Sequence, residues 1–389
     1  MPLVVYILGV TIFSITTSEF MVAGMMPSLT EALGISVAQV GYLISLYATG
    51  MVIGGPVLTT ILLKLRVSNK NALLWLLVFY AIAQSCAASS DTYEVMSMAR
   101  IATGVAGAAC FGMALAICGD VVDSNSRGRA ASIVVAGMML ATVLGVPIAT
   151  MVDQYINWRA SFWLVVILTL LSALLITALV PKAKKDEEVS LTTELEEFGN
   201  KHLWAAYATS GLIIGATFAA FSYFAPILIQ VSGFSTSSIP WIIGAYGIAN
   251  VIGNSIAGRF ADRHTMSILF FGLIFLGIAL ALLASWMTNQ TLTLILVLVI
   301  GFVGIPMNPA MIARVMKTAK HAGPLVNTVH TSIINIGLGV GSWLGGFGIV
   351  AGHGLTSPLW VGVGLAVLGL LSLLPYFNRT KQALVFGGQ

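Results

Sequence analysis

The stretch YATGMVIGG at residues 47–55 returns in altered form as YGIANVIGN at residues 246–254. The two segments align with an offset of 199 positions, which pairs Tyr47 with Tyr246. Further identical pairs at an offset of 199 or 200 are Val52 with Val251, Ile53 with Ile252, Gly54 with Gly253, Gly104 with Gly304, Gly137 with Gly337, and Gly145 with Gly345. The chain therefore consists of two similar halves that follow one another.

The composition places both halves in a lipid bilayer. Of the 389 residues, 58% are hydrophobic and only 8% are charged, with a mean hydropathy of +0.97. Soluble domains carry about 25% charged residues. A surface covered by so few charges would not remain in water, so the sequence predicts an integral membrane protein. The three cysteines have no spacing typical of a zinc site or a disulfide framework.

Apolar runs define the expected membrane spans, because about 20 apolar residues cross a bilayer as a helix. Helices are the natural form for such runs, since lipid offers no hydrogen bonds to the backbone. The sequence predicts twelve spans, at residues 3–26, 38–62, 71–89, 93–118, 128–151, 160–181, 203–231, 237–259, 266–286, 290–315, 324–350 and 357–377.

The basic residues predict the orientation of these spans, because loops rich in Lys and Arg stay in the cytoplasm. With twelve spans, the opposite side carries only Arg159, and Arg100 falls inside a span. The side that holds both termini carries Lys64, Arg66, Lys70, Arg127, Arg129, Lys182, Lys184, Lys185, Lys201, Arg259, Arg263, Arg314, Lys317, Lys320, Arg379 and Lys381. Both termini are therefore expected in the cytoplasm. The net charge of +4 reflects this bias and gives no indication of nucleic-acid binding.

The longest polar stretch divides the chain. Residues 182–202 are expected to form a cytoplasmic linker between an N-terminal six-helix bundle at 1–181 and a C-terminal six-helix bundle at 203–378, with a cytoplasmic tail at 379–389. The expected fold is an all-α membrane protein of 12 transmembrane helices in two pseudo-symmetric bundles. Such parallel repeats are a known plan of transporters, which bind substrate near the midplane between the halves.

Several motifs in these spans resemble those of the major facilitator superfamily. GRFADR, from Gly258 to Arg263, is similar to its cytoplasmic loop signature, and RIATGVAGAA, from Arg100, to its fourth-span arginine motif. The fifth span carries Gly137 and then Gly145-Val146-Pro147, followed by WRASF. Together with TSEFMVAGMMPSL and SIINIGLGVGSWLGG, these segments resemble the twelve-helix drug:proton antiporters, in the branch with sugar, nucleoside and chloramphenicol exporters.

The resemblance implies the major facilitator fold and proton-coupled efflux by alternating access. It covers nearly the whole chain, with two departures. Leu63 stands where the first-half copy of the loop signature would have its aspartate, and the fifth-span motif ends in GVPIAT instead of the full Gly-Pro-x-x-Gly-Gly. Both departures concern gating.

Glu19 and Arg100 are the candidate proton-coupling pair. A charge inside a span is costly and is a functional hypothesis by default. Both residues are expected at similar depth in the outer half, and by resemblance both spans line the central cavity. Neither charge has a counterpart in the other half, since Arg100 aligns with Ile300. Glu19 is therefore predicted to carry the proton, with a static pair that positions two helices as the alternative.

The remaining candidates concern gating and substrate. By resemblance, Asp262 bonds donors at a neighbouring helix N-terminus and latches one state, with Gly258 allowing close approach and Arg263 or Arg259 pairing with acids. The fifth-span residues Gly137, Gly145 and Pro147 are expected to bend the helix or to serve packing alone. The candidate cavity residues are Tyr47, Met138, Tyr223, Phe224, Tyr246, Asn250, Met307, Asn308 and Asn335, with interhelical hydrogen bonding as the equal alternative.

These features predict a secondary transporter in the cell inner membrane, of the efflux and multidrug-resistance type, and not an enzyme. The expected partners are protons, a small organic molecule and the lipid bilayer, and the expected state is a monomer. No phosphate-binding loop, cofactor motif or metal-ligand spacing is present in the sequence. Proton symport for uptake remains the alternative, and the residues do not specify the substrate.

Overall fold

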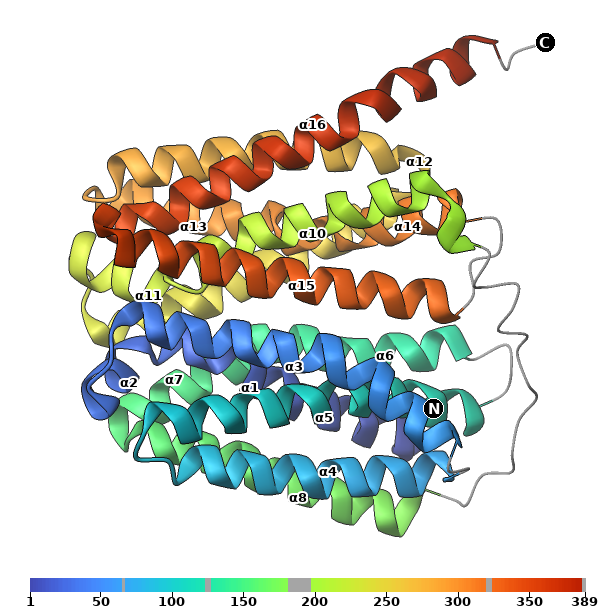
Figure 1. Ribbon diagram of the computed structural model, residues 1–389, viewed down its shortest axis with the longest axis vertical. Coiled ribbons are helices and arrows are strands. Elements are labelled where there is room, and N and C mark those ends of the chain that lie inside the picture. Colours follow the sequence, from blue (N-terminus) through green and yellow to red (C-terminus); the bar gives the residue numbers. More distant parts are fainter. Residues whose placement is uncertain (65–66, 123–126, 181–196, 320–323, 387–389) are drawn as a thin grey trace. The chain divides into compact units, whose positions relative to one another are not determined.

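The computed structural model describes residues 1–64, 67–122, 127–180, 197–319 and 324–386, and in these ranges every regular element is a helix (Figure 1). In the first half of the chain the elements are α1 (Leu3–Gly24), α2 (Met26–Leu33), α3 (Val37–Lys64), α4 (Asn69–Ala88), α5 (Tyr93–Asp120), α6 (Arg127–Leu140), the π-helical turn η2 (Ala141–Gly145), α7 (Val146–Tyr155) and α8 (Trp158–Leu179).

The described part of the second half also consists of helices, with more short π-helical and 3-10 turns between them than that of the first half. Its elements are η3 (Glu197–Gly199), α10 (Lys201–Phe221), α11 (Phe224–Pro226), η4 (Ile227–Val231), η5 (Thr236–Ser238), α12 (Ile239–Trp286), α13 (Gln290–Val303), η6 (Ile305–Met307), α14 (Asn308–Thr318), α15 (Pro324–Gly348), η7 (Ile349–His353), η8 (Gly354–Thr356) and α16 (Ser357–Phe386).

Two apolar segments are too long for one crossing. Thr236–Trp286 and Val326–Tyr376 each contain 51 residues, about 76 Å as straight helix at 1.5 Å per residue, against a hydrocarbon core of about 30 Å. The first turns at His264, whose backbone is non-helical. The second turns at Gly352 and Gly354, whose φ angles of 87° and 67° suit glycine. The ten long apolar segments of the described ranges thus provide twelve crossings, as predicted.

Contacts group the chain into two compact units. Unit 1 comprises Met1–Glu188 and Ser222–Gly247, and unit 2 comprises Val189–Phe221 and Ile248–Gln389. Within unit 1, α5 packs against α3 and α4, while α1 packs against α6 and α8 (Figure 1). Within unit 2, α10 packs against α14, α15 and α16. The linker predicted at 182–202 falls mostly outside the described residues, and the predicted bundle boundaries remain a prediction.

The segment Ser222–Gly247 belongs to unit 1 because it contacts several of its helices. The amide of Gln154 donates to the carbonyl of Thr236 at 2.7 Å. The ring of Tyr223 lies against Gly41, where an added Cβ would stand 2.0 Å from the hydroxyl. These contacts depend on packing between distant parts of the chain, so the sequence repeat does not predict that this segment belongs to unit 1.

Equivalent glycines make equivalent helix contacts in the two units. A Cβ added to Gly137 on α6 would lie 2.1 Å from the carbonyl oxygen of Gly9 on α1. A Cβ added to Gly337 on α15 would lie 2.2 Å from the carbonyl oxygen of Gly211 on α10. Small residues let membrane helices approach until their backbones touch. The sequence repeat is therefore also a repeat of packing.

Candidate functional site

Arg100 is the most deeply buried charge in the described part of unit 1. It lies on α5, two turns after the N-cap Thr92, and its side chain is fully buried. The guanidinium donates to the carbonyl oxygens of Ser18 at 2.8 Å, Glu19 at 3.1 Å and Leu43 at 3.4 Å. A buried cation is stable only when its donors are satisfied. Arg100 therefore joins α5 to α1 and α3 through backbone oxygens.

Tyr47 completes the environment of this cation. Its ring lies under the guanidinium, 4.4 Å from the Cζ atom to the ring centroid, in the range of a cation–π contact. The ring reaches this place because α3 and α5 touch: a Cβ added to Gly104 would lie 2.1 Å from the carbonyl oxygen of Tyr47. The Tyr47 hydroxyl is buried beside that of Tyr80 on α4, so both tyrosines belong to the polar cluster around Arg100.

The structure brings Glu19 beside Arg100, as predicted from their depth, but through the backbone. Arg100 bonds the Glu19 carbonyl, and no ion pair joins the two side chains. The Glu19 side chain is only 9% exposed. In the described part of the chain, the ion pair that is present joins Arg159 to Asp91 at 2.7 Å. The Glu19 carboxyl is thus close to a fixed positive charge and is not locked to it.

Ser18 and Gln84 extend this cluster and were missed by sequence reasoning. The Ser18 hydroxyl donates to Gln84 Oε1 at 3.0 Å and accepts from Arg100 Nη1 at 3.5 Å. Gln84 lies on α4 and is fully buried, and its Nε2 atom has no acceptor within the ranges that the structure describes. A lone amide in the apolar run LLWLLVFYAIAQ was the available signal, because polar groups inside spans mark functional sites.

The fifth-span motif packs directly on the helix that carries Glu19. A Cβ added to Gly145 would lie 2.0 Å from the Thr17 hydroxyl oxygen on α1. Gly145 ends the π-helical turn η2, and Pro147 follows in the first turn of α7. Proline lacks a backbone N–H and its ring crowds the carbonyl four residues earlier, and a π-turn is one way to absorb this. The π-helical turn lies where the bend was predicted, and both the bend and its role in gating remain predictions.

The loop signature lies at the turn of α12, in unit 2. Gly258, Asp262 and Arg263 are exposed. The Lys317 ammonium donates to the carbonyl oxygen of Asp262 and, at 3.0 Å, to the Thr265 hydroxyl. The Asp262 carboxylate makes no hydrogen bond or ion pair within the described ranges. The latch contact predicted for this carboxylate is therefore not seen, and its role stays a prediction.

The candidate cavity residues fall into both units. Tyr47, Met138, Tyr223, Phe224 and Tyr246 belong to unit 1, and Asn250, Met307, Asn308 and Asn335 belong to unit 2. Phe224 and Tyr246 meet edge to face with ring centroids 5.7 Å apart. Asn335 donates to the carbonyl of Thr331 at 3.0 Å, and Asn308 Oδ1 is buried without a donor from the described chain. Within unit 1 the structure also joins Tyr47 to the Arg100 site.

Two further charged residues are buried near helix ends. Arg314 is 6% exposed on α14, donates to the Thr209 hydroxyl at 2.8 Å and leaves Nη2 without a partner among the residues described. Asp153 is 7% exposed near the end of α7 and accepts from Ser28 at 2.7 Å. Asp153 lies just outside the predicted span 128–151, because hydropathy averaged over a span cannot separate a buried charge near a helix end from a loop charge.

His330 is packed and hydrogen-bonded within unit 2. It is 2% exposed, its Nε2 atom lies 2.9 Å from the Ser210 hydroxyl, and its ring stacks on Tyr207 with centroids 5.8 Å apart. These contacts describe a packed and hydrogen-bonded histidine. The polar groups of unit 2 therefore form a different arrangement from the Arg100 site.

A profile of the Major Facilitator Superfamily matches residues 8–329. The chain belongs to this superfamily. It is 30% identical over 371 residues to the MFS-type transporter YtbD of Bacillus subtilis (strain 168), covering 94% of this chain and 93% of that protein. It is 28% identical over 380 residues to a chloramphenicol resistance protein of Streptomyces lividans, covering 97% and 96%. It is also 28% identical over 376 residues to the inner membrane transport protein YdhP of Escherichia coli (strain K12), covering 96% and 95%.

Solved structures support the same fold for this superfamily member. An inward-facing, occupied structure of a bacterial homolog to the human lysosomal transporter Spinster superposes with a TM-score of 0.76 at 16% identity, covering 97% of this chain and 96% of that one. A mutant of the nucleoside transporter NupG gives 0.74 at 16% identity, covering 96% and 99%. The chain is thus a multi-pass membrane transport protein with the major facilitator fold, and not an enzyme.

Proposed function

We propose that this transporter exports a small organic molecule in exchange for protons by alternating access, with Glu19 as the proton carrier. The observation that carries the proposal is the geometry at Arg100. Its guanidinium is fully buried and bonded to three carbonyl oxygens, while the neighbouring Glu19 carboxyl makes no ion pair in the described chain. A carboxyl held beside a fixed charge, but not bonded to it, can gain and lose a proton without dismantling the structure.

The charge balance supports this role. With Glu19 ionised, the negative and positive charges of the site compensate one another. With Glu19 protonated, the site carries the charge of Arg100 alone, which is unfavourable in a buried region. Binding of a proton and binding of a substrate that offers an acceptor to the unpartnered Nε2 atom of Gln84 are then coupled through one electrostatic site. The static pair remains the alternative that the experiment below decides.

Export is favoured over uptake by the resemblance to a chloramphenicol resistance protein and by the fifth-span glycines. Gly145 lies against Thr17 on α1, two residues before Glu19 in the chain, and Pro147 follows in the first turn of α7. In this proposal the π-turn prevents the transporter from changing state, and so from leaking substrate, when no proton is carried. Proton symport for uptake is the second candidate. The substrate classes in question are drugs of the chloramphenicol type, sugars and nucleosides.

The proposal includes an orientation and a gate. The protein is proposed to be a monomer in the cell membrane. Its basic residues favour a cytoplasmic location for both termini. A reporter fused at residue 190 is then expected on the cytoplasmic side and one at residue 155 outside; the reverse result would overturn the orientation. The loop signature Gly258, Asp262 and Arg263 would act at the cytoplasmic end as a latch between the two states.

The test starts from a ligand screen. Purified protein is heated with chloramphenicol, a pentose and a nucleoside, because a ligand that binds the folded state raises its stability. The best stabiliser is then used in proteoliposomes with the Glu19→Gln variant, which keeps the hydrogen-bonding groups and cannot ionise. We expect this variant to bind the ligand, to lose transport driven by a pH gradient and to retain exchange of ligand for ligand.

Glu94→Gln is the matched control, because Glu94 is exposed in the first turn of α5. It should transport as the parent does. The Arg100→Lys variant should still bind protons at the site but transport more slowly, because the lysine ammonium cannot reproduce the planar set of donors of the guanidinium. If Glu19→Gln takes up or releases as many protons as the parent on ligand addition, Glu19 is not the carrier.

A further inference from the structure

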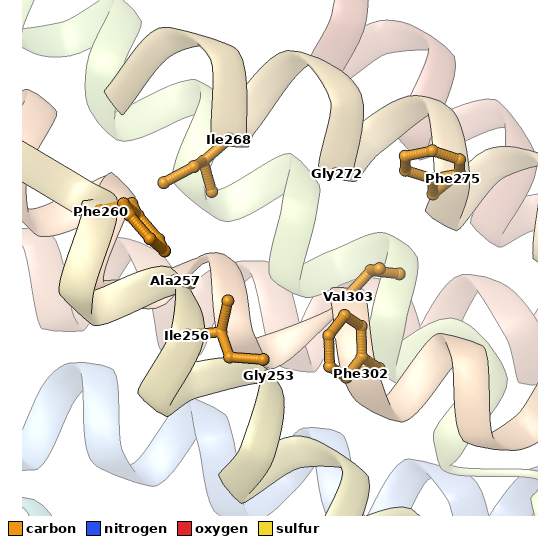
Figure 2. Close-up of a pocket in the computed structure, with 9 residues that line it drawn as sticks. All are labelled: Gly253, Ile256, Ala257, Phe260, Ile268, Gly272, Phe275, Phe302 and Val303. Carbon is orange, nitrogen blue, oxygen red and sulfur yellow. The ribbon is translucent and has the colours of Figure 1, made fainter. Parts of the chain in front are cut away.

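The turn at His264 divides α12 into a first limb before it and a second limb after it. A hollow of about 200 Å³ opens on unit 2 between these two limbs and the helix α13 (Figure 2). Phe260 and Ile268 lie at one end of it, and Phe275 and Phe302 lie at the other (Figure 2). The rest of the wall consists of Gly253, Ile256, Ala257, Gly272 and Val303. Every lining side chain is apolar, so no group in the hollow can orient a polar molecule.

The hollow opens on the outer surface of unit 2. Phe260, Phe275 and Phe302 are 47%, 54% and 41% exposed, although all three belong to segments long and apolar enough to cross a membrane. Apolar side chains with this exposure at membrane depth contact lipid. The volume is below the roughly 300–1,000 Å³ of pockets that enclose drug-sized ligands. A flexible hydrocarbon chain is the occupant that such a site fits.

Small residues create the hollow by bringing the helices together around it. A Cβ added to Gly253 would lie 2.2 Å from the carbonyl oxygen of Phe302, which fixes the first limb of α12 on α13. A Cβ added to Gly272 would lie 2.5 Å from Met307 Sδ, which fixes the second limb near η6. Ala257 also lines the hollow, and its small side chain leaves space there. The position of the first limb is therefore set by a backbone contact, and that of the second by the side chain of Met307.

Cationic groups lie at the end of the hollow where α12 turns. Ile256, Phe260 and Arg263 follow one another at spacings of four and three residues, so they share a helix face. The Phe260 ring meets the His264 ring with centroids 6.3 Å apart. Arg263 is exposed and forms no ion pair in the described ranges. The ammonium of Lys317 is held at the same turn by the Asp262 carbonyl.

We propose that this hollow binds one acyl chain of an anionic phospholipid whose headgroup phosphate lies at Arg263. The apolar wall accepts the chain, and the exposed guanidinium at its mouth matches a phosphate in charge and in its planar pair of donors. Lipid binding here would hold the two limbs of α12 against α13. The proposal does not depend on proton coupling or on the direction of transport.

The test is native mass spectrometry of the purified protein titrated with phosphatidylglycerol and with phosphatidylcholine of the same chains. Phosphatidylglycerol should bind more tightly, because each basic residue near an anionic headgroup contributes about a fivefold gain. Arg263→Gln should lower the phosphatidylglycerol affinity about fivefold and the phosphatidylcholine affinity less, because the choline cation offsets the phosphate charge. Lys70→Gln, which removes a cation from unit 1, is the matched control and should lower neither affinity at this site.

A second pair of variants tests the hollow itself. Ala257→Phe places a ring in the empty centre and should weaken both lipids, whereas Ile278→Phe changes a 51% exposed residue on α12 outside the hollow and should not. A phospholipid with a photoreactive group in its acyl chain should label peptides within residues 253–275 or the peptide that contains Phe302 and Val303. Equal binding of the two lipids, an unaffected Ala257→Phe variant, labelling elsewhere, or protection of the hollow by dimer formation would each overturn the proposal.

Discussion

The glycine contacts between paired helices give a sharp prediction about stability. In Gly137→Ala the new Cβ would lie 2.1 Å from the Gly9 carbonyl oxygen and 2.9 Å from its carbon. Both atoms belong to a helix backbone and cannot rotate away, so α1 and α6 must separate. Overpacking of this kind costs about 1–3 kcal/mol. Alanine regains about 1 kcal/mol over glycine in a helix interior, so the net loss is about 0–2 kcal/mol.

The chain provides its own controls for this prediction. Gly112 on α5 and Gly364 on α16 have nothing within 4 Å of an added Cβ, so alanine there should stabilise by about 1 kcal/mol. Gly337→Ala in unit 2 repeats the test, with a contact of 2.2 Å to the Gly211 carbonyl. The predicted order is that both contact variants melt below the parent and both controls melt at or above it.

A thiol-reactive dye measures this unfolding with native residues, because Cys110 and Cys118 are buried. Each kcal/mol should shift the apparent midpoint by a few degrees at one heating rate, since shifts of about 2–4 °C are usual for domains of 150–250 residues. If Gly137→Ala melts together with Gly112→Ala, the helices do not touch at Gly9. A loss only in unit 1 would mean that the packing repeat does not extend to both halves.

Two further predictions concern charges of unit 2. Asp262→Asn should impair transport, because the carboxylate is the proposed latch, without lowering the melting midpoint, because it is exposed and unbonded in the described ranges. Normal transport, with unchanged labelling of a cysteine placed at Met138, would exclude the latch. Arg314→Met should leave the midpoint unchanged or raise it, since an apolar side chain often replaces an incompletely paired buried charge at no cost. A fall of several degrees in Arg314→Met would instead show that the arginine is fully compensated.

The sequence predicted the helices and their pairing well because both depend on local or repeated signals. Apolar runs of about 20 residues mark spans wherever they occur, and the turn at His264 falls in the polar break between two predicted spans. The pairing of Gly137 with Gly337 carried information about packing, because only small residues allow such close backbones. These features are dictated by bilayer thickness and by the loss of hydrogen bonds in lipid.

The chemistry of the site was less accessible from the sequence. The depth of Glu19 and Arg100 placed them together, but whether Arg100 bonds a carboxylate or a carbonyl depends on the rotation of α1 about its axis, which hydropathy does not encode. Gln84 became part of the site only through Ser18, a contact 66 positions away in the chain. Asp153 fell outside the predicted span 128–151, because its helix ends nearby.

The repeat separates what the fold requires from what the chemistry requires. At an offset of 200, Arg100 corresponds to Ile300 and Arg314 corresponds to Ala114, and all four side chains are buried. An apolar residue thus suffices for packing at both places, so neither arginine is needed for a helix bundle of this kind. A buried cation that packing does not require is retained at a cost, and the two cations sit at non-equivalent positions. The asymmetry between the halves therefore points to function, with the Arg100 site suited to proton coupling because Glu19 lies beside it and Arg314 has no acid bonded to it in the described ranges.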